Sequence, residues 1–136
     1  MKINLRKSFI CGIKSTLLSK KEHLFIRKNK PWGIILFKRN IKNINQVNKL
    51  TKSIKKIFND PFYPILIDEE GGRVTRINNI VDNSIFSGKF FGNLYKENFQ
   101  KFNLFYKVYV DQISYVLNSI GVNINTVPIL DIKRNF

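Results

Sequence analysis

The chain has 136 residues, a formal net charge of +15 and 43% hydrophobic residues, including 12 Phe, five Tyr and one Trp. This length and apolar content suit one folded domain with a substantial core and exclude an intrinsically disordered chain. The charge makes nucleic acid, anionic membranes and acidic partners candidates. However, the lysines are spread along the chain, and no arginine-rich tract or helix-turn-helix signature is present, so we expect most of them to be solvated.

Apolar runs typical of buried strands alternate along the chain with stretches of helical periodicity. Ser19 and Glu22 form a capping box at the first helix, and Gly121 follows the last helix as a C-terminal cap. The predicted elements are, in order, a strand at Phe9–Ile13, a helix from Ser19 to Lys30, a strand at Gly33–Phe37, a helix from Ile44 to Phe58, a strand at Pro64–Ile67, a helix from Glu97 to Ser119 and a strand at Val122–Val127. This alternation predicts an α/β fold of parallel strands joined by right-handed crossovers.

One region between these elements leaves an alternative open. Residues 77–96 are polar and contain two glycines, which predicts a loop with at most one short helical turn. Phe90 and Phe91 within this loop are candidates for a sugar-stacking platform, although packing in the core is the more common role of such residues. From Phe99 to Ile120, apolar residues recur with helical spacing and predict one buried helix face.

The segment with the strongest functional signal follows the third predicted strand. Three carboxylates, two glycines and two arginines come directly after Ile67, namely Asp68, Glu69, Glu70, Gly71, Gly72, Arg73 and Arg76. In parallel α/β folds, ligands bind at the loops that follow the carboxyl ends of strands. This segment is therefore the candidate binding site.

The residue types in this segment suit the binding of a sugar. Alternation along the strand places Asp68 and Glu70 on one side and Glu69 on the other. A carboxylate accepts hydrogen bonds through two oxygens and can hold two neighbouring hydroxyls. The glycines permit close backbone approach, and the arginines supply charge partners for an acid or a ligand. The alternative, with equal weight from these residues, is an acidic surface turn closed by an internal Arg–Glu pair.

Three segments together resemble a known family. DEEGGRVTR, from Asp68 to Arg76, resembles the D-[QE]-E-G-G-R-V-x-R signature of family 3 glycoside hydrolases, and is most similar to the bacterial β-N-acetylhexosaminidase branch. Trp32–Asn40 resembles that family's G-[VI]-I-L-F-x-R-N segment, and Gly121–Asp131 resembles its G-[VI]-N-x-x-x-[AG]-P-V-L-D segment. Three segments in the right order are a more specific signal than one short motif.

The resemblance implies a fold and a set of site residues. The family's fold is an eight-stranded TIM barrel, of which residues 1–136 would form the N-terminal half with about four parallel strands. Asp68 and Arg76 would bind substrate, Asp68 through the sugar ring hydroxyls, while Arg39 and Asn40 would shape the end of the second strand. Five residues would shape the pocket floor: Glu70, Gly71, Gly72, Arg73 and Asp131.

The catalytic residues of the resembling family have no counterpart in this sequence. The family's nucleophile is an aspartate on a late strand, and the acid/base is a histidine beside a K-H-[FY]-P-G-H-G segment. Retaining glycosidases need both groups on opposite sides of the bond. Asp68 and Glu70 would approach a sugar from one side, which makes them a poor catalytic pair. We therefore expect no catalytic residue here, and a fragment that binds a β-linked N-acetylglucosaminide without hydrolysing it.

The whole protein implied by the resemblance is a hydrolase of peptidoglycan-derived amino sugars. The chain would then be truncated, completed by a second chain, or a gene remnant. Cys11 is the single cysteine, which excludes an internal disulfide. The apolar run in the basic N-terminal segment is too short for a signal peptide, so we expect a cytoplasmic protein without membrane spans. We expect no cofactor and no metal ion.

Two alternative functions remain open at this point. A basic nucleic-acid or polyanion-binding module would show affinity that falls steeply with salt. A non-functional remnant would leave strand edges unpaired and would aggregate.

Overall fold

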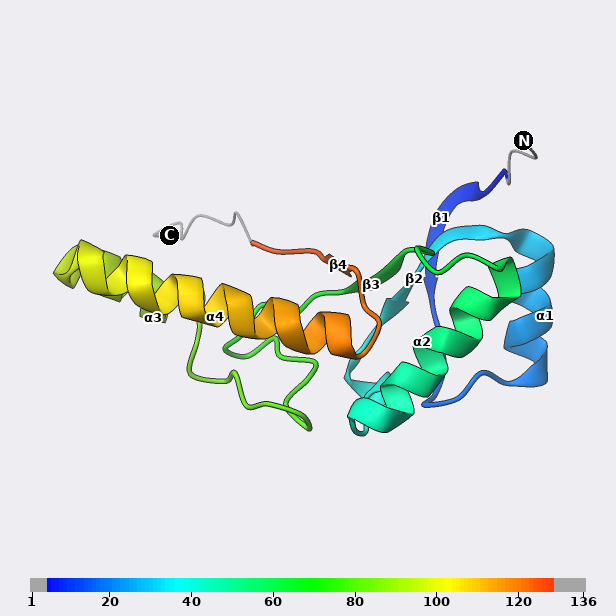
Figure 1. The fold of residues 1–136 in the computed structure, drawn as a ribbon, viewed down its shortest axis with the longest axis horizontal. Helices are drawn as coiled ribbons and strands as arrows, with labels where there is room; N and C mark the ends of the chain where they lie inside the picture. The colour runs from blue at the N-terminus through cyan, green and yellow to red at the C-terminus, as the bar shows by residue number, and fades with distance from the viewer. Residues whose placement is uncertain (1–4, 129–136) are drawn as a thin grey trace, which may run out of the picture.

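A computed structural model describes residues 5–128 of the chain. Its elements are, in order, β1 (Lys7–Gly12), α1 (Lys20–Asn29), β2 (Pro31–Leu36), the short 3-10 helix η1 (Lys38–Asn40), α2 (Ile44–Phe58), β3 (Ile65–Ile67), α3 (Gly88–Glu97), α4 (Phe99–Ser119) and β4 (Ile124–Asn125). The strands form one four-stranded sheet in the order β1-β2-β3-β4, and each neighbouring pair is parallel (Figure 1). The predicted α/β architecture is confirmed.

Local sequence signals set the ends of the first two helices. The Ser19 hydroxyl accepts a hydrogen bond from the Glu22 amide, and Glu22 accepts one from the Ser19 amide at 2.9 Å, so the predicted capping box is present. The helix ends at Lys30, whose left-handed backbone (φ 48°) turns the chain directly into β2. The Asn43 side chain caps the start of α2 by accepting a hydrogen bond from the Gln46 amide at 2.9 Å, and Asn59 ends the helix with a left-handed backbone.

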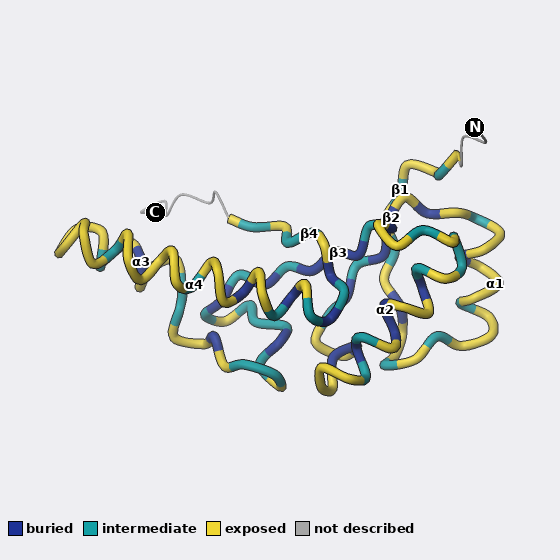
Figure 2. The backbone as a smooth tube through the Cα atoms, in the orientation of Figure 1, coloured by how far each residue is buried: buried dark blue, intermediate teal, exposed yellow. Residues whose placement is uncertain are grey.

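One apolar core joins the sheet to the helices. The central strands contribute Ile34, Leu36, Ile65 and Ile67, all fully buried. Residues of α1, α2 and α4 pack in the same cluster, among them Ile26, Val47, Leu50, Ile54, Ile113 and Leu117. Figure 2 shows the buried residues concentrated along β2, β3 and the adjoining sides of the helices. Removal of this apolar surface from water is the main stabilising contribution.

The predicted loop at residues 77–96 was wrong in its second half, which forms α3. Ser87 caps this helix by accepting a hydrogen bond from the Phe90 amide. Gly88 and Gly92 lower the intrinsic helix propensity of this segment, so the sequence pattern did not predict a helix. Packing compensates, because the buried Phe91 ring meets Tyr106 of α4 edge-to-face at 5.0 Å. Phe91 thus takes the core role rather than that of a sugar platform.

The predicted apolar face of the last helix is only half buried. Of the residues on that face, Ile113 and Ile120 are buried, but Phe99 and Phe105 are exposed. The first half of α4 extends beyond the sheet and packs alongside α3 (Figure 1). The final strand is also shorter than predicted, covering two residues of the expected Val122–Val127. Within residues 5–128, no helix has the length and hydrophobicity that a membrane crossing requires.

Candidate functional site

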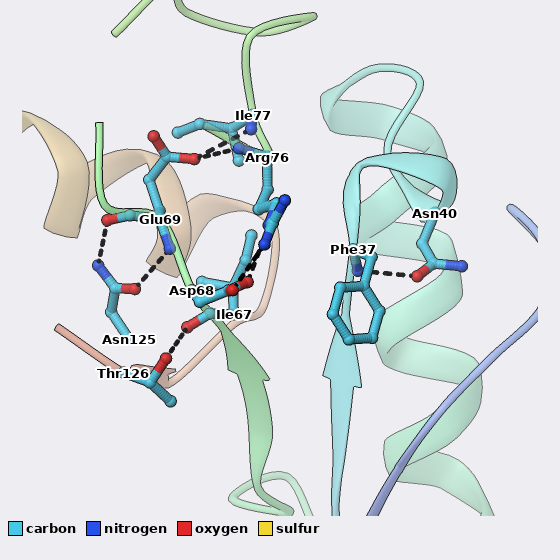
Figure 3. Close-up of polar contacts among 9 residues, drawn as sticks. All are labelled: Phe37, Asn40, Ile67, Asp68, Glu69, Arg76, Ile77, Asn125 and Thr126. Atoms are coloured by element: carbon cyan, nitrogen blue, oxygen red, sulfur yellow. Dashed lines mark hydrogen bonds and ion pairs between the residues drawn. The ribbon is translucent and has the colours of Figure 1, made fainter. Parts of the chain in front are cut away.

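The candidate site lies where β3 ends, and its centre is an ion pair between Asp68 and Arg76 (Figure 3). The guanidinium donates from Nε to Asp68 Oδ1 at 2.9 Å and from Nη2 to Oδ2 at 2.7 Å. Such a bidentate pair fixes both groups in orientation. The side chains are partly exposed, by 23% for Asp68 and 26% for Arg76. The pair is therefore accessible to a ligand.

Electrostatics keep this pair charged. The hydrogen bonds from Arg76 hold the pKa of the Asp68 carboxyl below its usual range, and they raise the pKa of the Arg76 guanidinium. The guanidinium also lies over the Phe37 ring, 5.8 Å from its centroid, at the end of β2. A cation beside an aromatic face is stabilised by the ring quadrupole. The site thus combines groups from two neighbouring strands.

A different carboxylate, Glu69, holds the backbone of this site in place. Its side chain is 1% exposed, and its Oε2 accepts hydrogen bonds from the backbone amides of Arg76 at 2.6 Å and Ile77 at 3.1 Å. Burial, with the Glu69 carboxylate adding to it, raises the pKa of Tyr109 on α4 to about 12. Glu69 therefore fixes where the Arg76 side chain begins. As the alternation predicted, Glu69 lies on the opposite side from Asp68 and Glu70; in the structure it is buried, whereas they are partly exposed.

Two side chains near β4 fix the other end of the segment. The Asn125 amide donates to the Glu69 carbonyl at 3.2 Å, and its oxygen accepts from the Glu69 amide at 3.0 Å. The Thr126 hydroxyl donates to the Ile67 carbonyl at 3.3 Å (Figure 3). These contacts extend the pairing of β3 with β4 beyond the last strand residues. They hold Asp68 at the point where the strand stops.

The double glycine turns the chain back after the acids. Gly71 and Gly72 both have positive φ, 73° and 60°, which L side chains rarely adopt. The turn is closed by a hydrogen bond from the Glu70 amide to the Val74 carbonyl at 3.0 Å. Arg73 lies exposed at its tip, and no ion pair to it occurs among residues 5–128. Asp131, also predicted to shape the pocket, lies outside the described residues.

The loop after β2 is tied to the end of β1 by Asn40 and Arg39. Asn40 is fully buried, and its amide donates to the carbonyls of Ile13 at 3.1 Å and Ser15 at 2.9 Å. Its oxygen accepts from the Phe37 amide at 2.9 Å. Arg39 donates to the same Ile13 carbonyl at 3.1 Å and lies over the Phe37 ring. Both residues thus shape the end of the second strand, as expected.

The structure brings some predicted site residues together and adds others. Asp68 and Arg76 are in direct contact, whereas Glu70 and Arg73 occupy the turn beside them. The alternative prediction was an acidic turn closed by an internal Arg–Glu pair. The structure does contain an internal ion pair with an arginine, but the acid in it is Asp68 and not a glutamate. Glu69 and Asn125 were missed as site residues. The sequence signal that could have found them is a polar residue at the end of a strand. Backbone amides and carbonyls there have no partner in the sheet and need a side chain to bind them.

Acid should weaken the contribution of Asp68 to stability. A carboxyl whose pKa is lower in the folded state stabilises that state above its unfolded pKa, about 3.9 for Asp, and this stability is lost as pH falls through the folded pKa. We expect the Asp68→Asn variant to be less stable than wild type at pH 7 and nearly as stable at the lowest pH. Denaturant unfolding across this range measures the difference. The exposed Asp111→Asn should show a smaller change, and a constant Asp68→Asn difference at all pH values contradicts the expectation.

Comparison with known proteins finds similar sequences and structures, although no family model matches the chain. A β-hexosaminidase A from Pseudoalteromonas piscicida is 32% identical over 108 residues, which cover 76% of this chain and 17% of that protein. The chain therefore spans less than a fifth of that relative's length.

Solved structures match over more of the chain. NagZ from Neisseria gonorrhoeae superposes with a TM-score of 0.75 at 26% identity, covering 93% of this chain and 38% of that one. The same protein in complex with N-trifluoroacetyl-D-glucosamine gives a TM-score of 0.70 at 25% identity, over 93% of this chain and 37% of that one. A family 3 β-N-acetylglucosaminidase from Paenibacillus shares the fold, with a TM-score of 0.62 at 24% identity, over 88% of this chain and 22% of that one.

Proposed function

Because the chain matches the N-terminal part of larger family 3 glycoside hydrolases of the β-hexosaminidase type, we propose that residues 1–136 form the N-terminal half of such a catalytic barrel. The proposed activity is hydrolysis of β-linked N-acetylhexosaminides, such as amino sugars derived from peptidoglycan, by the completed barrel. Further residues of the same protein or a second chain would complete it. Within this half we assign sugar binding and no catalytic residue.

The observation that carries the proposal is the partly exposed Asp68–Arg76 pair at the carboxyl end of β3. A carboxylate offers about four acceptor positions, and Arg76 occupies two of them. The remaining two suit the neighbouring hydroxyls of a sugar ring. Arg76 keeps donors that the pair does not use, and these support the same subsite. The N-trifluoroacetyl-D-glucosamine bound by the Neisseria protein supports an N-acetylglucosaminide as the ligand.

The neighbouring residues are proposed to form the floor of the pocket. Gly71 and Gly72 allow the sharp turn on which this floor is built, because both adopt a positive φ that L side chains rarely take. Glu70 and Arg73 lie on that turn, and Asp131 belongs to the same proposed floor. None of these residues is assigned a role in bond cleavage.

A binding measurement tests the proposed sugar site. We expect methyl N-acetyl-β-D-glucosaminide to bind the protein, with saturation-transfer NMR signals on the acetyl group and the ring. Removal of Asp68 deletes charge-assisted hydrogen bonds worth roughly 1.5–3 kcal/mol, so Asp68→Ala should bind about tenfold more weakly or worse. Asp111→Ala, changed at an exposed site on α4, is the matched control.

The result that contradicts the proposal is equally specific. If Asp68→Ala remains folded by circular dichroism and binds the glycoside as well as wild type does, the sugar does not contact this carboxylate. Equal binding of methyl β-D-glucoside would instead remove the preference for an N-acetyl group while leaving the site itself in place.

A further inference from the structure

A cavity lies between α1 and α2, which are neighbours in the fold (Figure 1). Its volume is about 590 Å³, within the range of small-molecule pockets, roughly 300–1,000 Å³. Four of its lining residues are leucines, namely Leu17, Leu18, Leu24 and Leu50. Leu50 belongs to the core, but Leu17 and Leu24 are 68% and 64% exposed. The fold therefore leaves two large apolar side chains in water at the wall of a cavity.

The rim of this cavity, which we term the leucine groove, is basic. Lys20, His23 and Lys49 line it beside the leucines, and no acidic residue occurs among its described lining residues. Lys52 and Lys56 are exposed further along α2. The acid on the first turn of α1, Glu22, accepts hydrogen bonds from the backbone amides of Lys14 and Ser19. Glu22 keeps its negative charge, so the positive charge at the groove comes from the lining residues Lys20 and Lys49.

The leucine groove is independent of the sugar site. Every lining residue comes from α1, α2 or the segment just before α1, and none belongs to the loop after β3. Both of its walls are formed by the described residues themselves. Among its described lining residues there is no Phe, Tyr or Trp, the large rings on which the bases of single-stranded nucleic acids mainly stack.

We propose that the leucine groove binds a single-chain anionic amphiphile, an alkyl chain that ends in a carboxylate. The chain lies against the exposed leucines and removes their surface from water. The carboxylate lies at Lys20 and Lys49, whose alkyl stems extend along the apolar wall while their ammonium groups reach the rim. The combination of an apolar lining with a one-sign rim is what selects this chemistry over a neutral lipid or a polyanion.

Calorimetric titration with decanoate tests the proposal. We expect saturable 1:1 binding, with octanoate about fifteenfold weaker, because each buried methylene changes affinity about fourfold. We expect 1-decanol, which has the same chain without the charge, to bind at least tenfold more weakly. The double variant Lys20→Gln/Lys49→Gln should lose this preference for decanoate over 1-decanol.

Matched leucine variants locate the site. Leu24→Ser should weaken decanoate binding at least tenfold, while Leu104→Ser on α4, at a leucine of similar exposure (63%), should leave it unchanged. Both changes are at exposed positions, and an unfolding curve for each confirms that it folds; Leu17→Ser provides a second variant of the groove. Equal effects of Leu24→Ser and Leu104→Ser, or equal binding of decanoate and 1-decanol, overturn the proposal. The proposal is also overturned if the protein sediments with phosphatidylglycerol vesicles but shows no saturable binding of decanoate. That result would favour binding to a membrane surface.

Discussion

Replacing Gly71 with alanine will destabilise the protein by about 3 kcal/mol, because an added methyl group has no space there and the backbone conformation disfavours it. Its Cβ would overlap the Phe86 carbonyl oxygen and lie 2.8 Å from the Tyr109 hydroxyl. The φ of 73° adds the cost of a left-handed conformation. Because domains of this size are stable by only about 5–15 kcal/mol, this loss should be plain in denaturant unfolding.

Gly92 provides the matched control for Gly71. It lies within α3, and nothing lies within 4 Å of the position that its Cβ would take. Alanine is the better helix former by roughly 0.5–1 kcal/mol, so Gly92→Ala should stabilise the protein slightly. Two variants with the same chemical change would thus shift stability in opposite directions. Equal midpoints for Gly71→Ala and wild type would show that the turn does not have the described geometry.

Glu69→Ala will lower the free energy of unfolding by about 2–6 kcal/mol. The substitution leaves the backbone amides of Arg76 and Ile77 without their acceptor in a buried setting, at roughly 1–3 kcal/mol each. Release of this backbone also frees the Arg76 side chain from its fixed position beside Asp68. The variant should therefore lose sugar affinity as well as stability.

Glu69→Gln separates the hydrogen bonds from the charge. Glutamine keeps an oxygen acceptor of similar reach, and the resembling family's signature accepts either Gln or Glu at this position. Most of the stability lost in Glu69→Ala should return in Glu69→Gln, as measured by denaturant unfolding of both. An equal loss in the two variants would assign the effect to the negative charge rather than to the hydrogen bonds.

The architecture was largely readable from the sequence because its signals are local. Caps at Ser19, the period of α2 and the apolar run at β3 each depend on near neighbours, and each was found. The errors arose where packing overrides local preference. Helix α3 forms in spite of two glycines because Phe91 packs against α4, and no pattern within residues 77–96 records that contact.

The site was readable in part for a related reason. Asp68 and Arg76 stood out because charged residues directly after an apolar strand are informative, whereas Glu69 looked like one acid among three. Its burial depends on where the chain returns at Arg76 and Ile77, which the sequence does not state. Asn125 lies 56 positions from Glu69, so its contacts required the sheet order.

The loop that presents Asp68 closes through contacts between residues seven or eight positions apart. Short closures of this kind cost little chain entropy and form early. The Arg76 and Ile77 amides are consequently natural reporters in hydrogen-exchange experiments. Slow exchange at these two positions would mark a chain in which the loop that carries Asp68 has already assembled, whatever the state of the surrounding helices.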